Sequence, residues 1–134
     1  MINLVIGTKG SGKTKTIIEQ INHAAKTTSG NVVVIEKSMK LTYDIVHKAR
    51  LIDVDEYNIS GSDMLYGFVC GVLAGNYDIT ELYIDGILKV IGRDFDQLGK
   101  LLDAIELKAG DAVKVVVTVS ASEDELPESV RKHI

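Results

Sequence analysis

The sequence is poor in the residues that build cross-linked or irregular structures. Its only cysteine, Cys70, cannot form a disulfide within the chain, so nothing indicates an oxidising compartment. The only proline is Pro127, and no apolar run reaches the roughly 18 residues that would span a bilayer. The first residues also lack the basic and apolar regions of a secretory signal peptide. We therefore expect a cytoplasmic protein without membrane insertion.

The length of the chain favours one domain. A chain of 134 residues can bury a hydrophobic core but is too short for two ordinary domains, so we expect a single domain over residues 1–134. Apolar residues make up 46% and charged residues 25% of the sequence, which is typical of a globular protein.

Basic residues are concentrated in the N-terminal part. The first 50 residues contain eight of the 15 lysines and arginines but only three of the 19 acidic residues. This distribution suits a polyanionic ligand in that part, and it argues against a nucleic-acid surface over the whole molecule. A chance scatter of solvated lysines explains the distribution equally well.

Strand-like and helix-like segments alternate along the chain. Short runs rich in β-branched residues predict strands at 2–6, 31–35, 50–57, 82–84 and 113–119. Apolar residues at helical spacing predict helices around 17–25, 64–73 and 98–105. Such alternation predicts a three-layer α/β fold with a mostly parallel sheet of about five strands flanked by helices.

Three glycines recur every four residues in the second predicted helix. Gly67, Gly71 and Gly75 would share one helix face, on which another backbone could approach closely. We expect this face to pack tightly against the sheet. A contact between two helices of a dimer is the alternative.

The strongest functional signal is the segment from Gly7 to Thr14, GTKGSGKT, which fits the Walker A or P-loop motif G-x-x-x-x-G-K-[ST]. The segment follows a predicted strand and opens a predicted helix, which is the context that the motif requires. Backbone N–H groups of such a loop, together with the helix N-terminus, bind phosphates. A glycine-rich turn before an amphipathic helix is the alternative interpretation.

The motif assigns a role to most of its residues. The predicted nucleotide ligands are Gly7, Lys9, Gly10, Ser11, Gly12, Lys13 and Thr14. Lys13 would reach the β and γ phosphates, and the Thr14 hydroxyl would bind Mg²⁺.

A phosphate-bound Mg²⁺ usually needs a carboxylate at the end of a neighbouring strand. The segment ELYID places Asp85 at the end of an apolar run, which is the Walker B pattern, so Asp85 is the predicted metal ligand beside Thr14. An ordinary aspartate at a turn is the alternative. Asp53 and Asp55, after a shorter and more polar run, are rival candidates for the metal.

Hydrolysis needs a group that activates water. Position 86 is a glycine, whereas many P-loop ATPases have a glutamate directly after the Walker B acid. Glu36 ends the second predicted strand, and open α/β sheets assemble their sites at the carboxyl ends of strands, so Glu36 could face the γ-phosphate. A surface ion pair with Lys37 or Lys40 is an equal alternative.

The order of these segments resembles the RecA-type ATPase core of RecA, DnaB and KaiC. In that family a glutamate after the second strand is the catalytic carboxylate, and a polar residue after the strand that follows Walker B senses the γ-phosphate. The resemblance implies catalytic roles for Lys13, Glu36 and Ser120. It also implies that Arg93 or Arg131 could be an arginine finger across a subunit boundary, with plain surface charge as the alternative. The chain is similar as well to short bacterial P-loop proteins that are labelled PilT-like.

These patterns together predict binding of Mg²⁺ and ATP with slow hydrolysis. The chain lacks the Asn-Lys-x-Asp segment that reads guanine in GTP-specific switches, so ATP is favoured. A nucleotide-binding regulatory module without significant turnover and a small-molecule kinase are the alternatives. Assembly into a homo-oligomer is left open. Binding of nucleic acid has no support, because the length leaves no room for the DNA-binding loops of RecA and DnaB.

Overall fold

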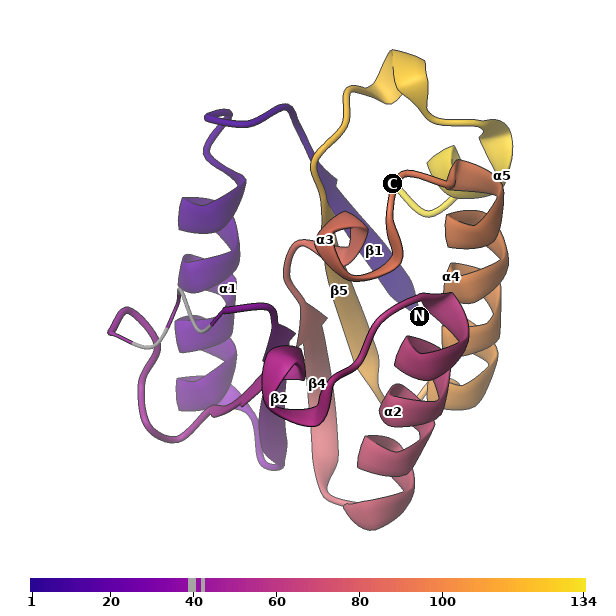
Figure 1. Ribbon diagram of the computed structural model, residues 1–134. Coiled ribbons are helices and arrows are strands. Elements are labelled where there is room, and N and C mark those ends of the chain that lie inside the picture. Colours follow the sequence, from indigo (N-terminus) through magenta and orange to yellow (C-terminus); the bar gives the residue numbers. More distant parts are fainter. Residues whose placement is uncertain (39–40, 42) are drawn as a thin grey trace.

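The computed structural model describes residues 1–38, 41 and 43–134, which form an α/β fold around one five-stranded sheet (Figure 1). The strands are β1 (Ile2–Ile6), β2 (Asn31–Glu36), β3 (Arg50–Asp53), β4 (Ile79–Ile84) and β5 (Lys114–Val119). Their spatial order is β1-β5-β4-β2-β3, and every described pair of neighbours is parallel. The predicted parallel sheet is therefore confirmed.

Helices flank the sheet on both faces. The helices are α1 (Lys13–Thr27), α2 (Ser62–Gly75), α3 (Ile87–Ile91), α4 (Phe95–Ala109) and α5 (Glu128–Arg131). Helix α1 covers one face, and α2 and α4 lie side by side on the other (Figure 1). Short 3₁₀ helices span Val54–Tyr57 and Glu123–Glu125. No helix in the described part of the chain is long and apolar enough to cross a bilayer.

The alternation of side chains along each strand explains why both faces are covered. In β2, Val34 packs in the core beneath α1, whereas Val33 and Ile35 pack in the larger core beneath α2 and α4. Successive side chains of a strand point to opposite faces, so a strand with an unbroken apolar run needs a helix on each side.

Several element boundaries differ from the sequence prediction. Strand β4 begins at Ile79, earlier than predicted, and β3 is limited to Arg50–Asp53. The chain turns after β3 because the Asp53 side chain accepts a hydrogen bond from Asp55 N and caps the 3₁₀ helix. Helices α3 and α5 were not predicted, since segments of five and four residues are too short to show a helical period.

The expectation that the α2 glycines pack against the sheet is wrong. A Cβ atom added at Gly67, Gly71 or Gly75 would meet no atom of the described residues within 4 Å beyond its own stretch of helix. Leu65 and Val69 are the buried residues of this helix. Gly67 and Gly71 follow them by two positions, which in an α-helix turns these glycines away from the core, and Gly75 lies one further turn along the same face.

The topology brings several predicted site residues to one edge. Because the sheet is parallel, the carboxyl ends of all five strands meet there, which is where open α/β sheets bind ligands. Strand β5 lies between β1 and β4. The loop after β1 therefore faces the ends of β5 and β4, and the edge strand β3 lies furthest from it.

Candidate functional site at the carboxyl edge of the sheet

A cavity of about 440 Å³ opens at this edge. Residues from the loop after β1, from the ends of β4 and β5 and from α3 line it: Lys9, Gly10, Lys13, Thr14, Leu41, Asp85, Gly86, Lys89, Thr118 and Ser120. The cavity thus joins segments that the sequence analysis had treated as separate motifs.

The glycine-rich loop, residues 7–14, leaves several backbone donors unused. Gly7 N donates to Ala121 O and Ser11 N donates to Thr8 O, both at 3.1 Å. Within the described chain, the N–H groups of Gly10, Gly12 and Lys13 make no hydrogen bond. Unused amides at a helix start, combined with the helix dipole, can hold an anion.

Two glycines of the loop have backbone conformations that favour glycine. Gly10 has φ 85° and Gly12 has φ 92°, both in the left-handed region that other residues adopt with strain. Gly12 is also the N-cap of α1 and offers no side-chain cap to the helix. The exposed first turn of α1 is therefore open to an external acceptor.

Seven residues were predicted to bind the nucleotide, and four of them line the cavity. These are Lys9, Gly10, Lys13 and Thr14. Lys13 Nζ donates to Thr8 O at 3.1 Å, so its half-buried side chain folds over its own loop. Gly7, Ser11 and Gly12 complete the turn without lining the cavity. A Cβ atom at Gly7 would collide with the Ser11 side chain, which packs against it.

Asp85 is oriented by a residue that the sequence analysis missed. Thr118 Oγ1 donates to Asp85 Oδ1 at 2.6 Å and accepts from Gly86 N at 2.7 Å. The other carboxylate oxygen, Asp85 Oδ2, makes no hydrogen bond within the described chain. A threonine inside the apolar run VVVTV was the available signal, because a buried hydroxyl needs partners.

Ser120 also lines the cavity, and its backbone carbonyl is bound by Arg93, which lies between α3 and α4. Arg93 Nη1 donates to Ser120 O at 3.0 Å, and Arg93 Nη2 pairs with Glu125 at 3.0 Å. Arg131 pairs with Glu128 at 3.7 Å. Both arginines that were considered as fingers across a subunit boundary thus have partners in their own chain.

Glu36 is buried, with 2% of its surface exposed. Its Oε1 accepts from Leu41 N at 3.0 Å, and no described residue donates a hydrogen bond to its Oε2. Burial raises the pKa of this carboxyl, the Leu41 N–H opposes the rise, and the negative charges of Asp85 and Asp53 add to it. The alternative of a surface ion pair with Lys37 is wrong, and Lys40 lies outside the described residues.

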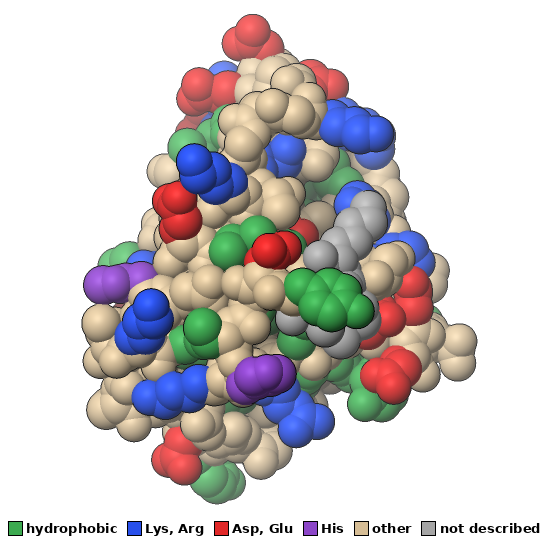
Figure 2. All heavy atoms as spheres, turned by 90° about the vertical axis from the view of Figure 1, so that its left-hand side faces the viewer, with side chains coloured by type: hydrophobic (Ala, Val, Ile, Leu, Met, Phe, Trp, Pro, Cys, Tyr) green, Lys and Arg blue, Asp and Glu red, His purple; other side chains and the backbone are tan. Residues whose placement is uncertain are grey.

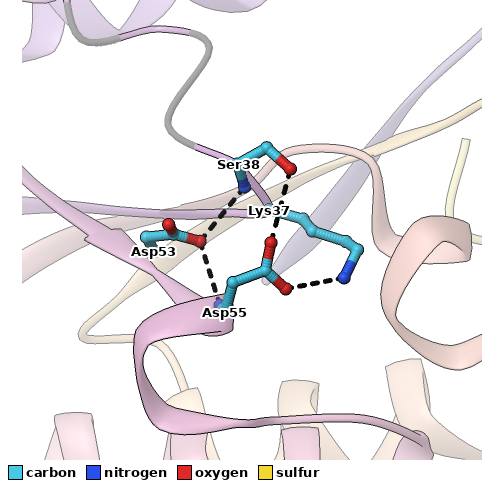
Figure 3. A network of polar contacts seen from close by, with 4 residues as sticks. All are labelled: Lys37, Ser38, Asp53 and Asp55. Atoms are coloured by element: carbon cyan, nitrogen blue, oxygen red, sulfur yellow. Dashed lines mark hydrogen bonds and ion pairs between the residues drawn. The ribbon is translucent and has the colours of Figure 1, made fainter.

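The rival carboxylates form a separate polar network (Figure 3). Lys37 Nζ pairs with Asp55 Oδ1 at 2.6 Å, and Ser38 N donates to Asp53 Oδ1 at 3.1 Å. Ser38 Oγ also donates to Asp55 Oδ2 at 3.3 Å. The network fastens the turn after β2 to the edge strand β3. Neither aspartate lines the cavity, so the structure separates both from the glycine-rich loop.

A magnesium ion would find oxygen donors in this cavity. Thr14 and Asp85 both line it, and hydroxyl and carboxylate oxygens are ligands that Mg²⁺ accepts. In the described ranges, no group of three or more His, Cys, Asp or Glu side chains could hold a metal ion alone. The remaining ligands would have to be water and oxygens of a bound anion, which is usual for Mg²⁺ in phosphate sites.

Basic side chains do not gather beside α1. On the face that Figure 2 shows, lysines and arginines lie dispersed among neutral and acidic side chains.

Comparisons with protein-family models and with curated proteins identify no relative of the chain.

Proposed function

We propose that the protein binds the triphosphate of ATP, together with Mg²⁺, in the cavity at the carboxyl edge of the sheet. One observation carries the proposal: Gly10 and Lys13, whose N–H groups are unused within the described chain, line the same cavity as Thr14 and Asp85. Amides, a lysine and a metal-ligand pair are the groups that a chelated triphosphate requires. The cavity volume of about 440 Å³ is within the range of ligand pockets.

The individual roles follow from position. Lys13 would exchange its hydrogen bond to Thr8 O for phosphate oxygens, which are stronger acceptors because they are charged. Thr14 and Asp85 Oδ2 would hold Mg²⁺, which when bound neutralises charge on the phosphates. Thr118 would keep Asp85 in that orientation. ATP is favoured over GTP because the guanine-reading segment is missing from the sequence.

Slow hydrolysis is the proposed reaction. A water oxygen would attack the γ-phosphorus, the bond to the β,γ-bridging oxygen would break, and ADP would leave with that oxygen. Glu36 Oε2 would accept the proton of the water, since this oxygen has no hydrogen-bond partner among the described residues and burial raises the pKa of the carboxyl, which makes its ionised form a stronger base. Ser120 lines the cavity and is the candidate sensor of the γ-phosphate.

A nucleotide-binding module without turnover is the second candidate. The observation that favours it is the burial of Glu36, which does not line the cavity and whose Oε1 is held by Leu41 N. In this arrangement water beside the γ-phosphate would lack its base. Binding would then change the surface around the loop without breaking the triphosphate.

Thermal melting with and without Mg²⁺ and ATP tests the proposed binding. A ligand at about 100 times its Kd should add roughly 2.7 kcal/mol to the free energy of unfolding, which raises Tm by several degrees in a domain of this size. The absence of a shift with any nucleoside triphosphate would refute the proposal.

Release of inorganic phosphate distinguishes the two candidates. Steady turnover that Glu36→Gln abolishes supports the ATPase, and tight binding without turnover supports the module. Turnover that survives Glu36→Gln would show that another group activates water.

A further inference from the structure

Lys89 lines the cavity but belongs to none of the motifs found in the sequence. Among the described residues, Lys9 and Lys13 approach the cavity from the glycine-rich loop, and Lys89 approaches it from α3. Helix α3 begins directly after Asp85 and Gly86, so Lys89 enters from the side of the predicted metal ligand. The two sources of positive charge therefore lie on different walls of one cavity.

The start of α3 is fixed to the end of β5. Gly86 N donates to Thr118 Oγ1 at 2.7 Å, and Lys89 N donates to Gly86 O at 2.9 Å. Thr118 is buried in β5 and also holds Asp85. These hydrogen bonds place the backbone of Lys89 in a set position relative to the Asp85 carboxylate.

The side chain of Lys89 runs back over Gly86. A Cβ atom at residue 86 would lie 3.3 Å from Lys89 Cδ and 3.7 Å from Cε. The aliphatic part thus occupies the space that a side chain at position 86 would need. Gly86 also has φ 69°, which favours glycine for a second, independent reason. The position at which many P-loop ATPases have a glutamate is here covered by a lysine side chain.

The charge of Lys89 acts on a carboxylate that is buried beside the cavity. It lowers the pKa of Glu36, against the larger effect of burial. A second carboxylate, Asp85, lines the cavity together with Lys89. Two roles are compatible with this arrangement: Lys89 is a counter-ion for these two carboxylates, or it also binds an anion in the cavity.

We propose that Lys89 binds the terminal phosphate of the nucleoside triphosphate and so makes the site prefer ATP to ADP. This inference rests on the proposed function. The glycine-rich loop would hold the inner phosphates, and Thr14 and Asp85 would hold a metal ion that neutralises charge on the outer ones. The terminal phosphate would then lie toward Asp85, where Lys89 enters. The Lys89 ammonium group would form a charge-assisted hydrogen bond with the γ-phosphate, which ADP lacks. The site would therefore bind the triphosphate more tightly than the diphosphate.

Calorimetric titration of the full chain with Mg²⁺-ATP and with Mg²⁺-ADP tests this role. We expect Lys89→Met to weaken ATP binding by about tenfold or more, and to change ADP binding by less than about threefold. Lys26→Met is the matched control, because it removes the same charge at the far end of α1, and it should alter neither affinity. Lys89→Arg keeps the charge and should retain the preference for ATP.

The outcomes separate this inference from the proposed function. If the wild-type chain binds neither nucleotide, the proposed function fails and Lys89 loses its role with it. If the wild type binds both and Lys89→Met leaves the ratio of the two affinities unchanged, only the role of Lys89 is overturned, and the lysine is a counter-ion. Binding of ADP by Lys89→Met reports that the variant is folded. Lys89→Gln answers the same question if the Met variant does not fold.

Discussion

Thr118 of β5 donates a 2.6 Å hydrogen bond to Asp85, the residue that directly follows the neighbouring strand β4. The same hydroxyl accepts from Gly86 N, so one buried side chain sets both the carboxylate and the start of α3. This contact therefore fixes the positions of Asp85 and of Lys89 in α3, the two residues that would lie beside a terminal phosphate.

Thr118→Val should destabilise the protein and weaken Mg²⁺-dependent nucleotide binding. Valine keeps the shape of threonine but leaves the buried Gly86 N–H without an acceptor, which costs about 1–3 kcal/mol of unfolding free energy. Urea denaturation measures the loss. Thr118→Ser retains the hydroxyl and is the control. A Val variant as stable as the wild type would mean that Gly86 N finds another acceptor.

Lys13→Ala should abolish the stabilisation by Mg²⁺-ATP and leave the unliganded protein unchanged within about 0.5 kcal/mol. The side chain is half-buried over its own loop, and its described hydrogen bond goes only to Thr8 O. Melting curves with and without nucleotide measure both quantities. Lys26→Ala, at the other end of α1, should respond to nucleotide like the wild type. Retained binding by Lys13→Ala would place the phosphates elsewhere.

Glu36→Gln should stabilise the protein at neutral pH and have little effect in acid. Because burial raises the pKa of Glu36 above its ordinary 4.5, the folded state binds the proton more tightly than the unfolded state. The stability from this proton is complete below the unfolded pKa and disappears as pH rises through the folded pKa.

The measurement is the difference in Tm between Glu36→Gln and the wild type from about pH 4 to pH 8. Glutamine keeps the acceptor for Leu41 N and carries no charge, so the difference should grow with pH. A constant difference would mean that Glu36 ionises equally in the folded and unfolded states.

Gly71→Ala should stabilise the protein by up to about 1 kcal/mol. Gly71 lies inside α2, and an added methyl group would meet no described neighbour within 4 Å, so the gain in helix propensity is not opposed by a clash. Gly30→Ala is the contrasting variant, because its methyl group would collide with Asp78 O and Thr80. Thermal melting compares the two. Destabilisation by Gly71→Ala would show that this face of α2 is covered in solution.

The parallel α/β architecture was predictable because it depends on local patterns. Apolar runs of β-branched residues such as NVVVIE bury both faces of a strand, and the spacing of Leu98, Leu102 and Ile105 fits one helix face. The N-cap of α4 was predictable for the same reason, because Asp94 accepts a hydrogen bond from Gln97 N only three residues later in the chain. The motif from Gly7 to Thr14 lies at a strand–helix junction, as its sequence context predicted.

The sequence by itself therefore determined the five strands, their parallel arrangement, the three longer helices and the glycine-rich loop, since each depends on residues that are close in the chain. Only the tertiary structure decided which carboxylate shares the cavity with that loop. The strand order places Asp85 near it and leaves Asp53 and Asp55 at the far edge, where they hold the turn after β2. The tertiary structure also decided the positions of Thr118 and Lys89, because hydrogen bonds and contacts between strands have no fixed spacing in the sequence.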